Sequence, residues 1–166
     1  RPAVSANDLS AIVELLSKAK NPVLITGSGV QWSEAEREML AFVEAAGVPF
    51  YTTPQGRGVI PEDHKYCYLT SRAAAFRDAD LILVVGTRMN YIIGHAAPPR
   101  WNANAKIVRV DIDPIEIASS PRNLAVGVIA DARTAFQQLT AAVAGKVTPA
   151  TYETWRERLR TRNVQK

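Results

Sequence analysis

Two apolar runs in this sequence end abruptly at residues that can hold a ligand. The run Leu81–Val85 leads into Gly86-Thr87-Arg88-Met89-Asn90, and the run Ile107–Val110 leads into Asp111-Ile112-Asp113-Pro114. Continuous apolar runs are typical of buried parallel strands, and ligands of open α/β sheets lie beyond the carboxyl ends of such strands. Arg88 offers a permanent cation with planar donors, and Asp111 offers a carboxylate suited to hydroxyl or amino groups. We therefore expect both residues where a ligand is held.

The same residues have a purely structural interpretation. Arg88 could pair with Asp111 or Asp113 across adjacent strand ends, and Asp113 could cap the turn that begins at Pro114. Both possibilities are left open by the sequence.

A glycine turn, Thr26-Gly27-Ser28-Gly29-Val30, follows an earlier apolar run. Glycines let a backbone approach a phosphate closely, but the dinucleotide fingerprint needs a third glycine where this chain has Trp32. The acidic residue expected after the second strand is replaced by Thr52 and Thr53. We therefore expect no standard NAD site. The alternative for this segment is a tight strand–helix turn without a ligand.

A second glycine-rich segment, Thr52-Thr53-Pro54-Gln55-Gly56-Arg57-Gly58, places an arginine between two glycines. It is interpreted equally well as a surface turn or as a loop that meets a ligand or a neighbouring domain.

Other reactive residues give weaker signals. His64 and His95 are far apart in the sequence and have no cysteine or carboxylate at ligand spacing, so no metal site is predicted. Cys67 has no identifiable basic partner and is expected to be a packing thiol and not a nucleophile, and Trp101 is expected to pack under a long connection. No serine or lysine lies in a recognisable nucleophile motif, so we predict no catalytic residue.

Composition is that of an ordinary globular domain. The chain has 166 residues, 47% of them hydrophobic and 22% charged, with a single cysteine. One domain in a reducing compartment is therefore expected, and we predict a cytoplasmic protein. No apolar run is long enough to span a bilayer. The chain starts without Met or a signal-peptide pattern, from which we expect a piece of a longer protein.

The net charge of +4 is concentrated near one end. Residues 151–166 carry five basic side chains against two acidic ones, so three of the four net charges lie there. A nucleic-acid-binding face should involve the body of the fold and interleaved aromatic residues. We expect neither nucleic acid nor membrane as a partner.

Apolar runs alternate with amphipathic segments along the chain, which predicts βαβ units and a parallel sheet. We expect an α/β, Rossmann-like three-layer fold with a mostly parallel, about six-stranded sheet and helices on both faces. The Ser33–Glu36 pair predicts a capping box for a helix over 33–46, with Gly47 ending it. The predicted helices are 7–19 (capped by Asn7 or Asp8), 33–46, 73–77, 114–118, 131–143 and 151–162, and the predicted strands are 23–26, 48–53, 81–85, 107–111 and 125–129.

Taken together, these segments resemble the central domain of thiamine-diphosphate-dependent enzymes. The segments Asp78–Asn90 and Val110–Ile117 carry the resemblance most specifically, and Pro99-Arg100-Trp101 brings it closest to the oxalyl-CoA decarboxylase, 2-hydroxyacyl-CoA lyase and acetolactate synthase group. In that family the flanking domains bind thiamine diphosphate and Mg²⁺. The central domain holds FAD or ADP in some members and nothing in others.

The resemblance implies site residues and partners for this chain. Arg88 would meet the diphosphate or adenosine, Asp111 and the backbone of Ile112 the adenosine, Gly27 and Gly29 the phosphates, and Asp131 with Ala132 the adenine. It further implies a central domain over 1–146, with 147–166 a linker and helix leading to a catalytic domain. The parent would be a homodimer or tetramer. The alternatives are a structural spacer that binds no nucleotide and a free-standing nucleotide sensor.

Overall fold

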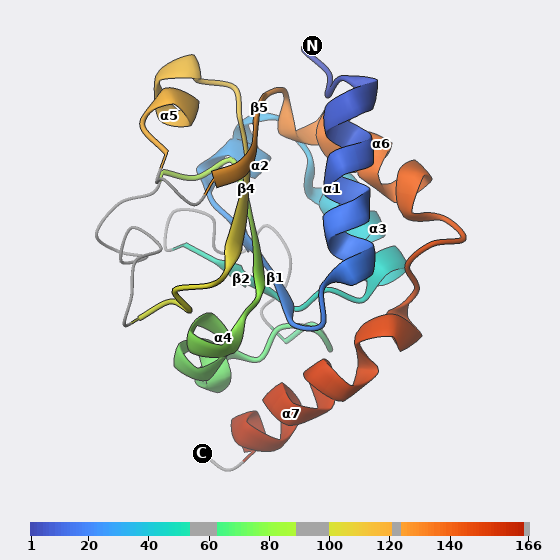
Figure 1. The fold of residues 1–166 in the computed structure, drawn as a ribbon, viewed down its shortest axis with the longest axis vertical. Helices are drawn as coiled ribbons and strands as arrows, with labels where there is room; N and C mark the ends of the chain where they lie inside the picture. The colour runs from blue at the N-terminus through green and yellow to red at the C-terminus, as the bar shows by residue number, and fades with distance from the viewer. Residues whose placement is uncertain (54–62, 89–99, 121–123, 165–166) are drawn as a thin grey trace.

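The computed structural model describes residues 1–53, 63–88, 100–120 and 124–164 (Figure 1). Within them five strands form one parallel sheet in the order β2-β1-β3-β4-β5. The strands are β1 (Pro22–Thr26), β2 (Phe50–Thr52), β3 (Leu81–Val85), β4 (Lys106–Asp111) and β5 (Leu124–Ile129). This confirms the α/β prediction. The described residues form five strands where about six were predicted.

The sheet reverses its winding between β1 and β3. After β1 the chain forms β2 at one edge, and it then returns to place β3 on the other side of β1. The register aligns Thr26 at the end of β1 with Val85 at the end of β3. Loops that leave such a switch point in opposite directions open a crevice at the carboxyl ends of the strands.

Helices lie on both faces of the sheet, as the sequence predicts. One face is covered by α1 (Ala6–Lys18), α3 (Glu36–Ala46) and α6 (Ala132–Val143), and α4 (Arg72–Asp78) lies on the other (Figure 1). The short helices α2 (Ser28–Trp32) and α5 (Pro114–Ala118) follow β1 and β4. Two further segments, η2 (Leu69–Ser71) and η4 (Pro149–Tyr152), precede α4 and α7 (Glu153–Val164).

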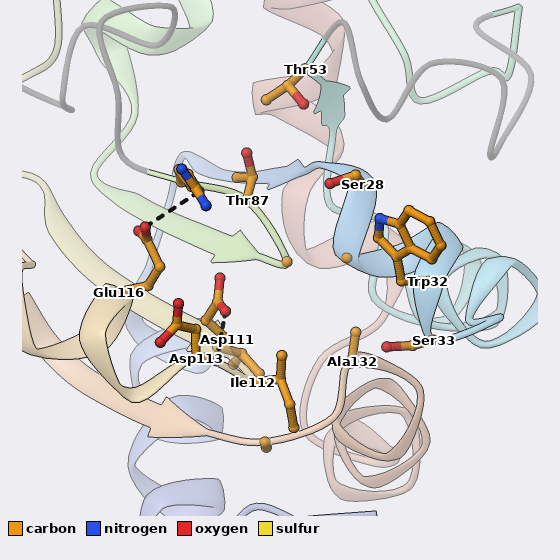
Figure 2. Close-up of a pocket in the computed structure, with 15 residues that line it drawn as sticks. Ser28, Trp32, Ser33, Thr53, Thr87, Asp111, Ile112, Asp113, Glu116 and Ala132 are labelled. Carbon is orange, nitrogen blue, oxygen red and sulfur yellow. Dashed lines mark hydrogen bonds and ion pairs between the residues drawn. The ribbon is translucent and has the colours of Figure 1, made fainter.

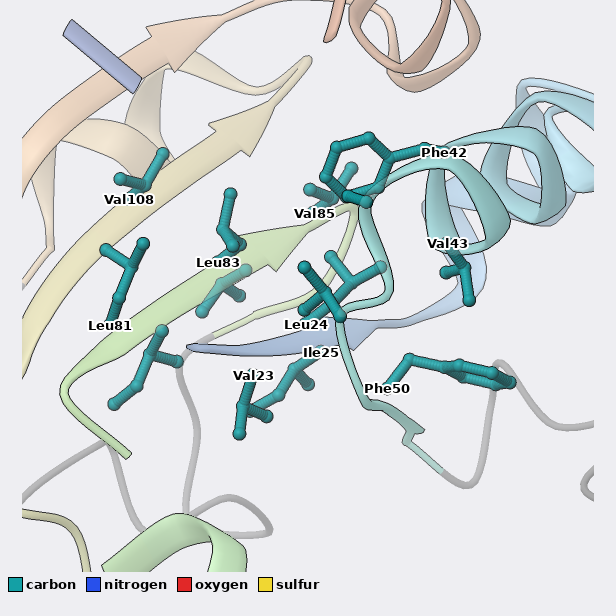
Figure 3. Close-up of a cluster of buried hydrophobic side chains, with 14 of the residues drawn as sticks. Val23, Leu24, Ile25, Phe42, Val43, Phe50, Leu81, Leu83, Val85 and Val108 are labelled. Carbon is teal, nitrogen blue, oxygen red and sulfur yellow. The ribbon is translucent and has the colours of Figure 1, made fainter. Parts of the chain in front are cut away.

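The core is continuous between the sheet and the helices. All residues of β1 and β3 are buried, and all of them except Thr26 are apolar. Phe42 and Val43 of α3 lie beside these strands in Figure 3. The ring of Phe42 is 5.7 Å from that of Phe136 on α6, so α3 and α6 pack on each other as well as on the sheet.

The second predicted helix is divided in two. A short helix, α2, ends at Trp32 with Ser33 as its C-cap, and α3 begins only after Ala35, whose side chain supplies no cap. Glu34 between them has a positive φ of 54°. The predicted capping box of Ser33 and Glu36 is therefore wrong, because Ser33 belongs to the end of the preceding helix. Gly47 ends α3 in the left-handed conformation, as predicted.

Residues 147–164 lie against the amino ends of the strands. Tyr152, Trp155 and Leu159 are buried, and the Trp155 indole donates to the carbonyl of Pro22 at 2.9 Å. The basic side chains of α7 pair within the chain: Arg158 and Arg162 lie near Asp78, and Arg156 donates to the carbonyl of Gly47. A domain boundary after residue 146 stays a prediction.

Two smaller findings complete the fold. Helix α1 is capped by Ser5, which accepts a hydrogen bond from the backbone of Asp8, instead of by Asn7 or Asp8 as predicted. No helix in the described ranges is both long enough and apolar enough to cross a membrane.

Candidate functional site

A cleft of about 610 Å³ lies at the carboxyl ends of the strands, beside the switch point. The predicted site residues that line it are Gly29, Arg88, Asp111, Ile112 and Ala132, whereas Gly27 and Asp131 do not. Figure 2 shows Asp111 and Ile112 on one side of the open space and Ser28 and Trp32 on the other. The sheet topology therefore brings the two strand ends singled out in the sequence to one site.

The glycines after β1 make close contact with the loop after β3. The backbone N–H of Gly29 donates to the carbonyl of Gly86 at 2.9 Å. A Cβ on Gly29 would lie 2.6 Å from the Cα of Gly86, and one on Gly27 would lie 2.5 Å from the Cβ of Thr87. The close packing of these two segments is therefore enough to explain why Gly27 and Gly29 are glycines, and a ligand is not needed to explain them.

Arg88 is held by a partner that the sequence did not indicate. Its Nε lies 3.5 Å from Oε1 of Glu116 on α5, and 78% of its side chain is exposed. The sequence-based alternative named Asp111 or Asp113 as its partner. Glu116 takes that place in the structure because α5 folds back over the end of β4.

Beneath this pair lies Arg109, which was not singled out in the sequence because it occurs inside an apolar strand. Its side chain is 1% exposed. The guanidinium donates to the carbonyls of Glu116 at 2.6 Å and Thr87 at 2.8 Å, to Ser120 Oγ at 3.1 Å and to Glu116 Oε2 at 3.3 Å. One buried cation therefore joins α5 to the segment that carries Arg88.

Asp111 lies half-buried at the end of β4. Burial raises the pKa of its carboxyl, against the opposing effects of a hydrogen bond from the Asp113 backbone and the charge of Arg109. Oδ1 accepts that hydrogen bond at 2.9 Å. A partly desolvated carboxylate gains from new hydrogen-bond donors, such as the hydroxyls of a ribose.

Asp131 is occupied as a helix cap. Its Oδ2 accepts hydrogen bonds from the backbone and hydroxyl of Thr134 at 3.0 and 3.1 Å, and it pairs with Arg1 at 3.2 Å. Burial acts to raise the pKa of Asp131, but the hydrogen bonds from Thr134, Ser33 and Arg1 outweigh it, so the pKa is lowered. The structure confirms that Asp131 caps α6, and Ala132 at its first turn borders the cleft.

Asp113 has the structural role that the sequence allowed. Its side chain accepts a hydrogen bond from the backbone of Ile115 at 2.9 Å and caps α5.

The sequence missed several residues of the cleft lining. Trp32 on α2 is 84% exposed, and Ile112, which is 58% exposed, lies on the other side of the cleft (Figure 2). Hydroxyl groups come from Ser28, Ser33, Thr53 and Thr87. The available signal was the tryptophan three residues after Gly29, which was considered above only as a missing glycine.

The remaining candidates lie away from the cleft or outside the described residues. His64 is 3.4 Å from Glu44, a carboxylate that the sequence spacing did not indicate. Cys67 is buried, and Trp101 is buried and stacked on Phe76 at 4.1 Å. His95 and residues 54–58 of the second glycine-rich segment are not among the described residues. In the described parts of the chain, no three metal-binding side chains come together.

The parallel sheet, its switch point and the cleft define a Rossmann-like α/β domain. The model of the family "Thiamine pyrophosphate enzyme, central domain" matches residues 9–139, and the chain belongs to this family. The resemblance stated from the sequence is thereby confirmed.

Curated relatives include the lyase and decarboxylase members of that group. The chain is 37% identical to 2-hydroxyacyl-CoA lyase 1 of Mus musculus over 124 residues, which are 73% of this chain and 21% of that protein. It is 34% identical to 2-hydroxyacyl-CoA lyase of Arabidopsis thaliana over 128 residues, covering 77% and 22%. It is 31% identical to oxalyl-CoA decarboxylase of Escherichia coli K12 over 133 residues, covering 80% and 23%. The chain thus spans about a fifth of these relatives' length.

Solved structures share the fold. Benzoylformate decarboxylase from Polynucleobacter necessarius superposes with a TM-score of 0.72 at 21% identity, covering 86% of this chain and 28% of that one. At this identity the likeness concerns the fold alone.

Proposed function

We propose that this chain is a non-catalytic central domain that binds an adenine nucleotide, ADP or FAD, in the cleft at the switch point. The observation that carries the proposal is the juxtaposition of Arg88 and Asp111 on one cleft. An exposed guanidinium suits a diphosphate, and a half-buried carboxylate suits the hydroxyls of the ribose.

The shape and lining of the cleft support this ligand class. Its volume lies within the range of about 300–1,000 Å³ of small-molecule sites. Trp32, Ile112 and Ala132 offer apolar surface for a planar base, and the hydroxyls of Ser28 and Thr87 offer hydrogen bonds to phosphate oxygens. These described residues could hold a nucleotide through apolar contacts and hydrogen bonds, with no metal ion needed to bind it.

The alternative is a structural spacer that binds no nucleotide. It is favoured by one observation: the residues that suggested a ligand already have intramolecular partners. The glycines are required by the contact with Gly86 and Thr87, Asp131 caps α6, and Arg88 pairs with Glu116.

Thermal unfolding with and without ligand separates the two. A ligand bound only by the native state stabilises it by about 2.7 kcal/mol at a hundredfold excess over Kd, so ADP or FAD should raise Tm. Thiamine diphosphate with Mg²⁺ should not. No shift with either nucleotide at millimolar concentration would establish the spacer.

Arg88→Ala tests the assigned role. Loss of a charge-assisted contact should weaken nucleotide binding about ten- to a hundredfold, and Arg88→Lys should restore only part of it. Arg77→Ala removes an exposed, carboxylate-paired arginine outside the cleft lining and is the matched control. Unchanged affinity in Arg88→Ala, with a large loss of stability without ligand, would remove Arg88 from the site.

The relatives suggest the parent protein. It would be a thiamine-diphosphate-dependent lyase, decarboxylase or carboligase that acts on 2-hydroxyacyl-CoA or 2-oxo acid substrates. Its flanking domains would supply thiamine diphosphate, Mg²⁺ and the chemistry, in a homodimer or tetramer. Activity of the full-length protein on both substrate classes tests this assignment.

A further inference from the structure

We propose that Glu116 is an internal counter-anion for Arg88. A phosphate-bearing ligand must replace the Glu116 carboxylate as the partner of Arg88. This inference rests on the proposed nucleotide function and concerns the selectivity of the same cleft. The starting observation is that Glu116 is shared by two arginines, with Oε1 3.5 Å from Arg88 and Oε2 3.3 Å from Arg109.

The two halves of this arrangement differ in how firmly they are held. Arg109 is 1% exposed, and a buried guanidinium strongly favours keeping its carboxylate. It also fixes the main chain of Glu116 through the 2.6 Å hydrogen bond to the Glu116 carbonyl. Arg88, in contrast, is 78% exposed and forms a long ion pair. Any exchange of partners therefore moves Arg88 and leaves Glu116 in place.

The position of Glu116 makes it a competitor of the ligand. Both Glu116 and Arg88 line the cleft. A phosphate that reaches Arg88 must replace the Glu116 carboxylate and then remains near that negative charge. The carboxylate consequently lowers affinity for anionic ligands, while an uncharged nucleoside should not be affected.

Glu116→Gln tests the inference, because this substitution in the cleft is expected to increase the affinity for ADP. The amide oxygen can still accept from Arg109, whereas the charge that competes for Arg88 is removed. An exposed ion pair is worth about 0.2–1 kcal/mol, so ADP should bind about 1.4- to fivefold more tightly to the variant, with the gain shrinking in high salt. Adenosine, which lacks phosphates, should bind both proteins equally. Calorimetric titration measures both ligands.

Asp113→Asn is the matched control. It removes one carboxylate from the same cleft while asparagine preserves the cap of α5. Its gain for ADP should be smaller than that of Glu116→Gln, because Asp113 does not contact Arg88 in the described ion pairs. Equal gains in the two variants would mean a general charge effect and would overturn the inference.

The ligand-free protein provides a second readout. The Nε–H NMR signal of Arg88 should shift in Glu116→Gln, and in the wild type it should shift when ADP is added. ADP binding that is unchanged or weaker in a folded Glu116→Gln protein overturns the inference and leaves the proposed function standing. Binding of neither ADP nor FAD by either protein overturns both the inference and the proposed function.

Discussion

The backbone N–H of Gly29 donates to the carbonyl of Gly86 at 2.9 Å, so the loops that leave β1 and β3 touch at the point where the sheet reverses its winding. Gly86 has a φ of +68°, which only glycine adopts without strain. The floor of the cleft therefore depends on two glycines, one in the first turn of α2 and one directly after β3.

Gly29→Ala should destabilise the chain by about 1–3 kcal/mol, because a Cβ 2.6 Å from Gly86 Cα would force the loops apart. Urea denaturation measures the loss. Ser28, the preceding residue, already carries a Cβ. Ser28→Ala is therefore the control and should change stability by less than about 0.5 kcal/mol. Equal stability of Gly29→Ala and the wild type would show that the loops separate without cost.

Arg109→Met should cost about 3–5 kcal/mol, because it leaves the carbonyls of Thr87 and Glu116 without their buried donor. Lys106→Met on the same strand, where the side chain is exposed, is the matched control and should be nearly neutral. Chemical denaturation of both variants gives the comparison. A neutral Arg109→Met would mean that Arg109 does not hold α5 to β3.

Asp131→Ala should cost about 1 kcal/mol at pH 7 through loss of the α6 cap. The pKa of Asp131 is lowered from 3.8 by folding, so its stabilisation is present above the unfolded value and is lost as the pH falls through the folded one. The difference from wild type should therefore shrink as the pH falls below about 4. Ser5→Ala removes the uncharged cap of α1 and should show a cost without this pH dependence. A constant cost for Asp131→Ala would contradict the assignment.

Trp155→Ala should cost about 3–5 kcal/mol, because the indole is buried and bonded to Pro22. Trp32→Ala, at an 84% exposed side chain, should leave stability nearly unchanged. Truncation of the chain after residue 146 should also lower its stability, because it removes Trp155 together with the other buried residues of this segment. A fully stable truncated chain would instead confirm the predicted domain boundary.

The sequence by itself determined most of the helices and strands and the parallel direction of the strands, although the helix predicted over 33–46 is divided in the structure. β3 occupies Leu81–Val85 and α5 occupies Pro114–Ala118, as predicted, and Asp131 caps α6. These features can be found from short stretches of sequence. A strand buried on both faces is an unbroken apolar run, and a helix cap is a side chain that accepts a hydrogen bond from the backbone two or three residues further on. The carboxyl-end rule for parallel sheets was enough to place Arg88 and Asp111 on one cleft.

Only the tertiary structure decided which residues pair within that cleft. Arg109 lies between the apolar residues Val108 and Val110 of β4, and nothing local indicates that it bonds to Thr87 and Glu116. The partner of Arg88 depended on how α5 folds back over β4, and the need for Gly29 depended on the loop after β3. Each of these contacts joins segments that the order of strands in the sheet brings together, and that order is not contained in any local pattern.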